Sequence, residues 1–190
     1  MKKILILIML IINIMCFSST SFAYPNEPEN FRNFVWGESV ESVRAKYPPL
    51  NDPDPISDKV TMYTIGTNVD YLGNIPIYKA ATVSFYEKQL SDVSSVVIIK
   101  NKKEFLPKTE LVLSDLATMF GKWTGERQDK HPNGEMTMVY EWIGTKTNVY
   151  AVFDIKADES KNTIIIQVSS SKLIKKLEED EAKNNKARGW

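Results

Sequence analysis

The chain has 190 residues, of which 24 are basic and 24 acidic, and it contains one cysteine and one histidine. The balanced charge argues against a nucleic-acid partner or an anionic membrane surface, since both select basic chains. One cysteine cannot form an intramolecular disulfide, and one histidine leaves a zinc site to be built mostly from carboxylates, which is unusual. The length suits one domain with a sizeable core.

Residues 1–23 have the pattern of a secretory signal peptide. Two lysines come first, residues 4–17 are almost wholly apolar, and Ser21-Phe22-Ala23 supplies small residues at the cleavage positions. The apolar run is shorter than the ~20 residues that a membrane-spanning helix needs. We therefore expect cleavage before Tyr24 and export to the periplasm or the medium, with no membrane span left. A retained anchor is the alternative.

Cys16 raises the further alternative of a lipoprotein. Ile14 and Met15 are bulkier than the small residues that precede a lipidated cysteine, so we expect Cys16 to leave with the signal. A chain that begins at Tyr24 would contain no cysteine. Loss of the two lysines in the signal would leave 22 of the 24 basic residues against 24 acidic ones.

Residues 24–30 are polar and rich in proline, which predicts an extended leader to the domain. A short helix of about two turns follows, with Ser39 as the N-cap. Its apolar residues at helical spacing are Val40, Val43 and Tyr47, and Pro48 ends the run.

A Trp-Gly pair, Trp36 and Gly37, stands immediately before this helix. Gly37 allows the chain to turn sharply or to approach another segment closely. Phe34 and Trp36 can pack onto the helix face made by Val40 and Val43, as a hydrophobic staple does. We therefore predict that Trp36 is a core side chain and not a platform for a ligand.

After a proline-rich loop, residues 48–58, the period of the apolar residues changes to two. This alternation predicts strands at residues 60–65, 80–86 and 90–100, the last two joined by a hairpin at residues 87–89.

A second helix is predicted at residues 108–120, with Pro107 in its first turn and Gly121 just past its end. Its expected apolar face consists of Leu113, Leu116, Ala117 and Phe120. Three strands follow at residues 136–143, 148–154 and 163–169, with turns at residues 144–146 and 157–162.

The two halves form a diverged internal repeat. The first helix residues Val40, Val43 and Tyr47 match Leu113, Leu116 and Phe120 at one constant offset of 73. Each helix also precedes about three strands, which predicts tandem α-β-β-β units at about residues 31–103 and 104–171 within one domain, residues 31–171. The fold class is therefore α+β, with two layers, an antiparallel sheet and helices on one face. Residues 172–190 form a charged helix or tail, with an apolar stripe at Leu173, Ile174 and Leu177.

The first helix start resembles that of known families. Residues 37–43, Gly-Glu-Ser-Val-Glu-Ser-Val, fit the G-x-S/T-x-x-x-V pattern of the BamE-like and β-lactamase-inhibitor-protein-like families. Residues 31–47 also resemble the F-x-x-x-x-W-G-x-S-x-x-x-V opening of many small exported bacterial proteins. The resemblance implies a two-layer α+β fold and protein binding, either in outer-membrane assembly or in blocking an enzyme. The chain lacks the lipidated cysteine of the first family and the disulfides of the second, so no specific partner carries over.

No arrangement of residues predicts catalysis. His131 lies in a turn-prone stretch, and no G-x-S-x-G elbow is present. Asp52, Asp54 and Asp58 alternate as calcium ligands do, but their loop lacks the glycine and the bidentate glutamate of such a site. No glycine-rich turn precedes a helix, as a phosphate loop requires. We predict no catalytic residue, no metal site and no cofactor.

The alternation along the last three strands predicts two different faces. The core face carries Met136, Met138, Tyr140, Trp142, Val149, Ala151, Phe153, Ile164, Ile166 and Val168. The other face places aromatic residues beside polar groups, as protein-binding surfaces do. The predicted binding residues there are Tyr86, Val139, Glu141, Tyr150, Val152, Ile165 and Gln167. An ordinary half-solvated sheet is the alternative.

The sequence thus favours an exported, non-enzymatic binding module that engages an envelope or extracellular protein, or a small ligand, through its open sheet face. A carboxylate-based envelope hydrolase and a purely structural envelope protein are the alternatives. An acidic cluster in a closed pocket would favour the hydrolase, whereas an exposed apolar patch on the sheet would favour the binding module.

Overall fold

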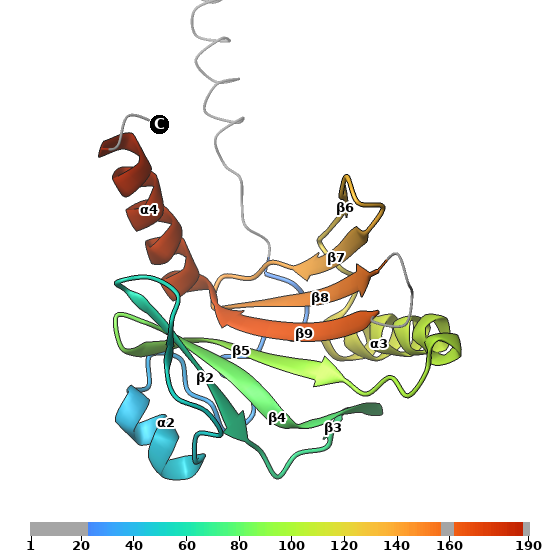
Figure 1. Ribbon diagram of the computed structural model, residues 1–190, viewed down its shortest axis with the longest axis horizontal. Helices are drawn as coiled ribbons and strands as arrows, with labels where there is room; N and C mark the ends of the chain where they lie inside the picture. Colours follow the sequence, from blue (N-terminus) through green and yellow to red (C-terminus); the bar gives the residue numbers. More distant parts are fainter. Residues whose placement is uncertain (1–22, 157–161, 188–190) are drawn as a thin grey trace, which may run out of the picture.

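An antiparallel sheet organises the chain in the computed structural model, which describes residues 23–156 and 162–187 (Figure 1). The fold is α+β, with nine strands among the described residues. In chain order the elements are α2 (Val40–Lys46), β1 (Asp54–Pro55), β2 (Val60–Gly66), β3 (Tyr71–Leu72), β4 (Ile75–Tyr86), β5 (Gln89–Val97), the 3₁₀ turn η1 (Lys102–Glu104), α3 (Phe105–Phe120), β6 (Gly125–Lys130), β7 (Met136–Trp142), β8 (Thr147–Ile155), β9 (Thr163–Ser170) and α4 (Ser171–Ala187).

The strand order across the sheet, β1-β2-β4-β5-β9-β8-β7-β6, is built from two similar halves, with β3 paired to β4 off this path. The long strands β2, β4 and β5 follow α2, and β7, β8 and β9 follow α3. The last long strands of the two halves, β5 and β9, pair antiparallel at the centre, with Val93 opposite Val168. The tandem order of helix and strands therefore gives one continuous sheet.

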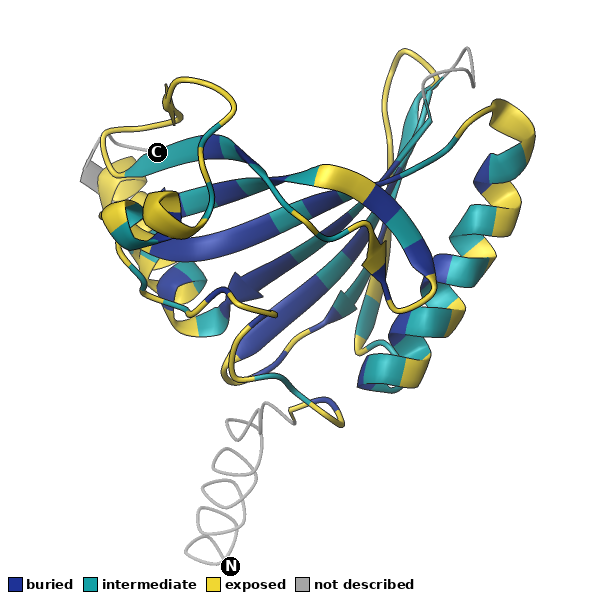
Figure 2. Cartoon of the chain, turned by 90° about the horizontal axis from the view of Figure 1, so that it is seen from below, coloured by how far each residue is buried: buried dark blue, intermediate teal, exposed yellow. Residues whose placement is uncertain are grey.

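One side of the sheet, the covered face, packs against α2 and α3. Val43 of α2 and Leu116 of α3 lie in one hydrophobic cluster with side chains from the central strands. The predicted core face is confirmed except at Met136, which is only partly buried. Its buried members are Trp142, Val149, Ala151, Phe153, Ile164, Ile166 and Val168, and Met138 and Tyr140 pack against them. In Figure 2 the buried residues accordingly follow the strands, whereas exposed residues dominate the loops.

The helix α3 begins earlier than predicted and turns a slightly different side to the core. It starts at Phe105, so Pro107 lies in the first turn, and its C-cap Gly121 has φ of 83°. The buried row includes Val112, Leu116 and Phe120, whereas Leu113 is only partly buried. The predicted face was therefore right at Leu116 and Phe120, and Leu113 packs at its margin, but the prediction missed Val112. Val112, Leu116 and Phe120 are spaced four residues apart and stack along one side.

The Trp-Gly pair joins the first helix to the sheet. Gly37 has φ of 83°, its N–H donates to the carbonyl of Leu90, and Leu90 N–H donates back to the carbonyl of Glu38. Trp36 packs against the core, and its Nε1 donates to Oγ1 of Thr147 at 2.9 Å. Trp36 thus packs against the core, as predicted, and also makes a partly buried hydrogen bond.

Residues 24–29, the N-terminal strap, are docked on the domain. The Tyr24 ring is 3 % exposed, meets Phe120 edge-on at 5.9 Å, and its hydroxyl donates to the Thr147 carbonyl. The carboxylate of Glu27 accepts from the backbone N–H of Lys146 and of Thr147. The predicted leader is therefore fixed to the domain, because an aromatic ring and a carboxylate anchor it.

Gly144 explains the close passage of the strap. A Cβ at this position would lie 2.2 Å from Glu27 Oε1 and 2.5 Å from the Thr147 carbonyl oxygen. Only glycine leaves room for the strap at this turn.

Several predicted segments lie outside the described residues. These are the signal peptide up to residue 22, most of the turn at residues 157–162, and the end of the chain at residues 188–190. Within the described ranges, no helix combines the length and the apolar character that crossing a membrane requires.

Candidate binding face

Six of the seven predicted binding residues lie in two neighbouring rows on the open face, which is the side of the sheet opposite α2 and α3. The first row is apolar and crosses β7, β8, β9 and β5 through Val139, Val152, Ile165 and Val96. The second row is mostly polar and follows the same strands through Glu141, Tyr150, Gln167 and Ser94. Alternation along single strands thus becomes two continuous rows across four strands.

Two members of these rows are less available than the sequence indicates. Val139 is only 3 % exposed. Glu141 accepts a hydrogen bond from Nη1 of Arg127 at 2.6 Å, and Arg127 belongs to the edge strand β6. Strand β6 was not predicted, because its residues are almost all charged or polar and lack the β-branched residues that mark strands. The accessible part of the apolar row is therefore Val152, Ile165 and Val96.

Tyr86 is the predicted binding residue that the structure removes from the open surface. Its side chain is 1 % exposed, its hydroxyl donates to Oδ2 of Asp180, and Nζ of Lys176 lies 5.3 Å from its ring centre. Both partners belong to α4, which leaves β9 and stands away from the body of the domain in Figure 1. Tyr86 is thus a docking point for α4, and its assignment to the binding surface was wrong.

Ion pairs complete this attachment of α4, which we term the α4 clamp (Tyr86, Lys59, Glu87, Lys176 and Asp180). Lys59 lies 2.5 Å from Oδ2 of Asp180 and 3.4 Å from Glu87, and Lys176 also pairs with Glu87. Hydrogen bonds from Lys59 and Tyr86 hold the pKa of Asp180 well below its usual range.

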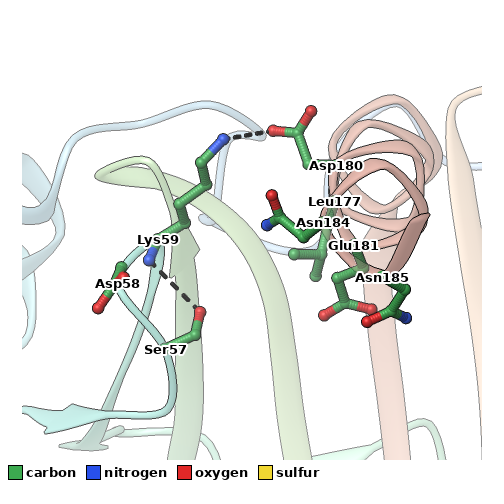
Figure 3. A pocket seen from close by; sticks show the side chains of 8 residues that line it. All are labelled: Ser57, Asp58, Lys59, Leu177, Asp180, Glu181, Asn184 and Asn185. Atoms are coloured by element: carbon green, nitrogen blue, oxygen red, sulfur yellow. Dashed lines mark hydrogen bonds and ion pairs between the residues drawn. The ribbon is translucent and has the colours of Figure 1, made fainter. Parts of the chain in front are cut away.

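A polar groove of about 500 Å³ lies beside the clamp (Figure 3). Its lining residues are Ser57, Asp58, Lys59, Leu177, Asp180, Glu181, Asn184 and Asn185. Figure 3 shows that Lys59 reaches across to Asp180, so this carboxylate of the groove is already paired with a cation.

The open face also carries a hollow of about 530 Å³, which lies over the central strands. Its lining is formed by Thr64, Tyr78, Ala80, Ala81, Thr82, Ser94, Val96, Val152, Ile165 and Gln167. A register shift between Ile77 and Ala81 interrupts the pairing of β4 with β5 at its side, and such bulges bend a sheet locally. The hollow therefore joins the accessible apolar residues Val96, Val152 and Ile165 to the half-exposed ring of Tyr78.

Asp92 lies beneath one end of this hollow and was not among the predicted residues. It is 5 % exposed, and burial raises its pKa to about 6 in spite of two hydrogen bonds. Ser94 Oγ donates to Oδ1 at 3.1 Å and Gln167 Nε2 donates to Oδ2 at 2.7 Å. An aspartate inside a predicted strand was the available signal, because aspartate is rare in strands.

His131 and the remaining acidic side chains of the described residues lie apart from the hollow. His131 is exposed, and its Nε2 lies 3.2 Å from Oγ1 of Thr137, which in turn donates to Asp154. Among the described residues, no group of three or more His, Cys, Asp or Glu side chains is placed to hold a metal ion. Asp52, Asp54 and Asp58 all lie exposed in the segment before β2.

Comparison with known proteins adds no relative to this picture. No family model matches the chain, and neither a curated protein nor a solved structure matches it.

Proposed function

We propose that this chain is an exported, non-enzymatic binding module that engages another protein through the open face of its sheet. The observation that carries the proposal is the accessible apolar row of Val96, Ile165 and Val152, which continues into a hollow of about 530 Å³. Protein interfaces favour apolar and aromatic groups at the centre with polar groups around them. Here Tyr78 and Tyr150 supply aromatic groups near the row.

The support for binding rather than catalysis comes from the residues that line the hollow. In the described part of the chain, this lining includes no histidine, cysteine or carboxylate. A hydrolase that works with carboxylates needs two of them at a defined separation across its substrate. The strands β5, β9 and β8 beneath the apolar row are joined by continuous ladders, so this part of the face is a rigid platform. The resemblance of the first helix start to protein-binding families agrees with this proposal, and the apolar N-terminal segment supports export.

Affinity capture from an envelope extract tests the proposal. The parent chain is compared with a variant that carries Tyr150→Ala and Ile165→Ser, and with the control Leu106→Ser. Leu106 is 71 % exposed on α3, so the control removes a large apolar side chain far from the open face. We expect the parent and the control to retain the same protein and the open-face variant to lose it.

The urea midpoints of the three proteins must agree, so that loss of capture is not loss of folding. A partner that all three proteins retain equally would show that the open face is an ordinary solvated sheet.

A further inference from the structure

The polar end of the hollow has a fixed hydrogen-bond direction. Asp92, when ionised, can only accept hydrogen bonds. Its two oxygens take the hydroxyl proton of Ser94 and one amide proton of Gln167. Both of these residues also line the hollow, whereas Asp92 itself is buried behind them.

This arrangement leaves Ser94 and Gln167, which line the hollow, with oxygens that can accept hydrogen bonds. With its hydroxyl proton committed to Asp92, Ser94 offers the lone pairs of Oγ. With its Nε2 committed to Asp92, Gln167 offers the carbonyl oxygen Oε1. Neither oxygen accepts a hydrogen bond from another of the described residues. The negative charge behind them strengthens their preference for a donor and disfavours an anion.

The rest of the lining selects against a full charge on the occupant. None of the charged side chains that the structure describes lines the hollow, so a cation would lose water without gaining a direct ion pair. The remaining lining is apolar or hydroxyl-bearing, and its volume is within the range of roughly 300–1,000 Å³ that is typical of ligand pockets. An apolar group with an attached neutral hydrogen-bond donor complements both the apolar lining and the acceptors of the hollow.

We propose that the hollow takes an apolar side chain of a partner protein, while a backbone N–H next to that side chain donates to Gln167 Oε1 or Ser94 Oγ. This inference rests on the protein-binding function proposed above and specifies its recognition chemistry. Val96, Val152 and Ile165 contact the apolar side chain, and Asp92 acts as a positioning residue that keeps the acceptors turned outward.

Two small probes test the inference without knowledge of the partner. N-acetyl-L-leucine N-methylamide carries an apolar side chain with two N–H donors. Its counterpart with both amide nitrogens methylated keeps the side chain and the carbonyls but donates no hydrogen bond. Each is titrated into the ¹⁵N-labelled full-length chain, purified as the cell processes it, while the amide signals of residues 94–96, 152 and 165–167 are followed by NMR.

We expect the donor probe to shift these signals and to bind about three- to tenfold more tightly than the methylated probe, the effect of one hydrogen bond. Gln167→Met removes one acceptor and should reduce this preference while retaining apolar binding. Asp92→Asn places a donor where an anionic oxygen stood, so one of its partners must reverse and the preference should fall as well. One variant removes an acceptor and the other introduces a donor. If one of them does not fold, the other still tests the inference.

The remaining outcomes separate this inference from the proposed function. Equal binding of both probes at the open face would overturn the donor selection and leave the binding face intact. If neither probe shifts the signals of the open face, the hollow is not a binding site and both proposals fail.

Discussion

On the covered face of the sheet, Trp142, Val149 and Ile166 are completely buried under the helices, whereas their strand neighbours Glu141, Tyr150 and Gln167 on the open face remain partly exposed. The covered face is nearly uniform, because most inward side chains of the central strands belong to one hydrophobic core. The open face is divided into an end under α4, an apolar hollow and a buried carboxylate. The same strands thus support packing on one side and varied chemistry on the other.

The difference shows at which positions the burial of a side chain can be predicted from the sequence of its own strand. On the covered face, alternation is enough to place a residue in the core. On the open face, burial depends on elements from elsewhere in the chain. Tyr86 is buried where α4 is attached, and Glu141 is neutralised by Arg127 from β6. Predictions for this face therefore require the tertiary neighbours, and experiments should find larger and more uniform effects on the covered face.

The largest expected effect is the loss of Trp142 from the covered face. Its indole is completely buried, contacts Phe120 and Trp123 edge-on, and donates from Nε1 to the Gly121 carbonyl at 2.8 Å. We expect Trp142→Ala to lower the free energy of unfolding by about 3–5 kcal/mol, as for other large aromatic truncations. Urea unfolding followed by circular dichroism measures this loss.

Ile165→Ala on the open face is the matched comparison. Ile165 is partly exposed, so we expect a loss of only about 1 kcal/mol. Similar losses for the two substitutions would contradict the division of the sheet into a packed face and an open one.

The next effect has the opposite sign, because Asp92 is a buried carboxylate on the open face. Its pKa is about 6 in the folded chain and 3.8 in the unfolded chain, so the folded state holds a proton more tightly between these values. Stability from this group is therefore lost as the pH rises from about 4 to about 6. We expect Asp92→Asn to raise the free energy of unfolding at pH 7, by up to about 3 kcal/mol.

Urea unfolding of parent and variant at several pH values measures the difference. The two proteins should be nearly equal in stability at pH 4, diverge between pH 4 and pH 6, and keep a constant difference above pH 6. Other carboxylates such as Asp180, whose pKa is lowered, contribute equally to both proteins and cancel in the difference. A constant difference between pH 4 and pH 6 would show that Asp92 is not the group that titrates.

The N-terminal strap should contribute a smaller amount at the border of the covered face. Glu27 accepts hydrogen bonds from Thr145 Oγ1 and from the backbone N–H groups of Lys146 and Thr147. We expect Glu27→Ala to lower the free energy of unfolding by about 1.5 kcal/mol, as for other hydrogen bonds to a charged group. Glu29→Ala, which removes only an exposed pairing with Lys146, is the control and should have a smaller effect. Hydrogen exchange at residues 146 and 147 should accelerate only in Glu27→Ala.

The fold could be predicted from the sequence wherever a single local pattern, such as alternation or a capping residue, determines the structure. The six long strands follow from alternation, and Ser39 is the predicted N-cap, with its hydroxyl accepting from Ser42 N–H. The short strands β1 and β3 and the charged strand β6 were missed, because pairing partners rather than their own composition create them.

The candidate site was predictable only in part, for a similar physical reason. Val152, Ile165 and Gln167 were found because alternation assigns them to the open face, where the ladder aligns them. Tyr86 was misassigned because the position at which α4 docks cannot be predicted from the sequence of the strand. The hollow depends on how β4, β5, β8 and β9 are arranged in space, so no single strand reveals it.

The smallest expected effect is the removal of an exposed ion pair from the α4 clamp. Lys176 and Glu87 are both solvent-accessible, so their attraction is screened and offset by the entropy of two long side chains. Lys176→Ala should therefore leave the urea midpoint and the hydrogen exchange of α4 nearly unchanged, in low and in high salt alike. Tyr86→Phe, which removes the hydroxyl that bonds Asp180, should accelerate exchange in α4 more than Lys176→Ala does. The reverse order would mean that surface charge fixes α4, and that the open face, unlike the covered face, is assembled by electrostatics.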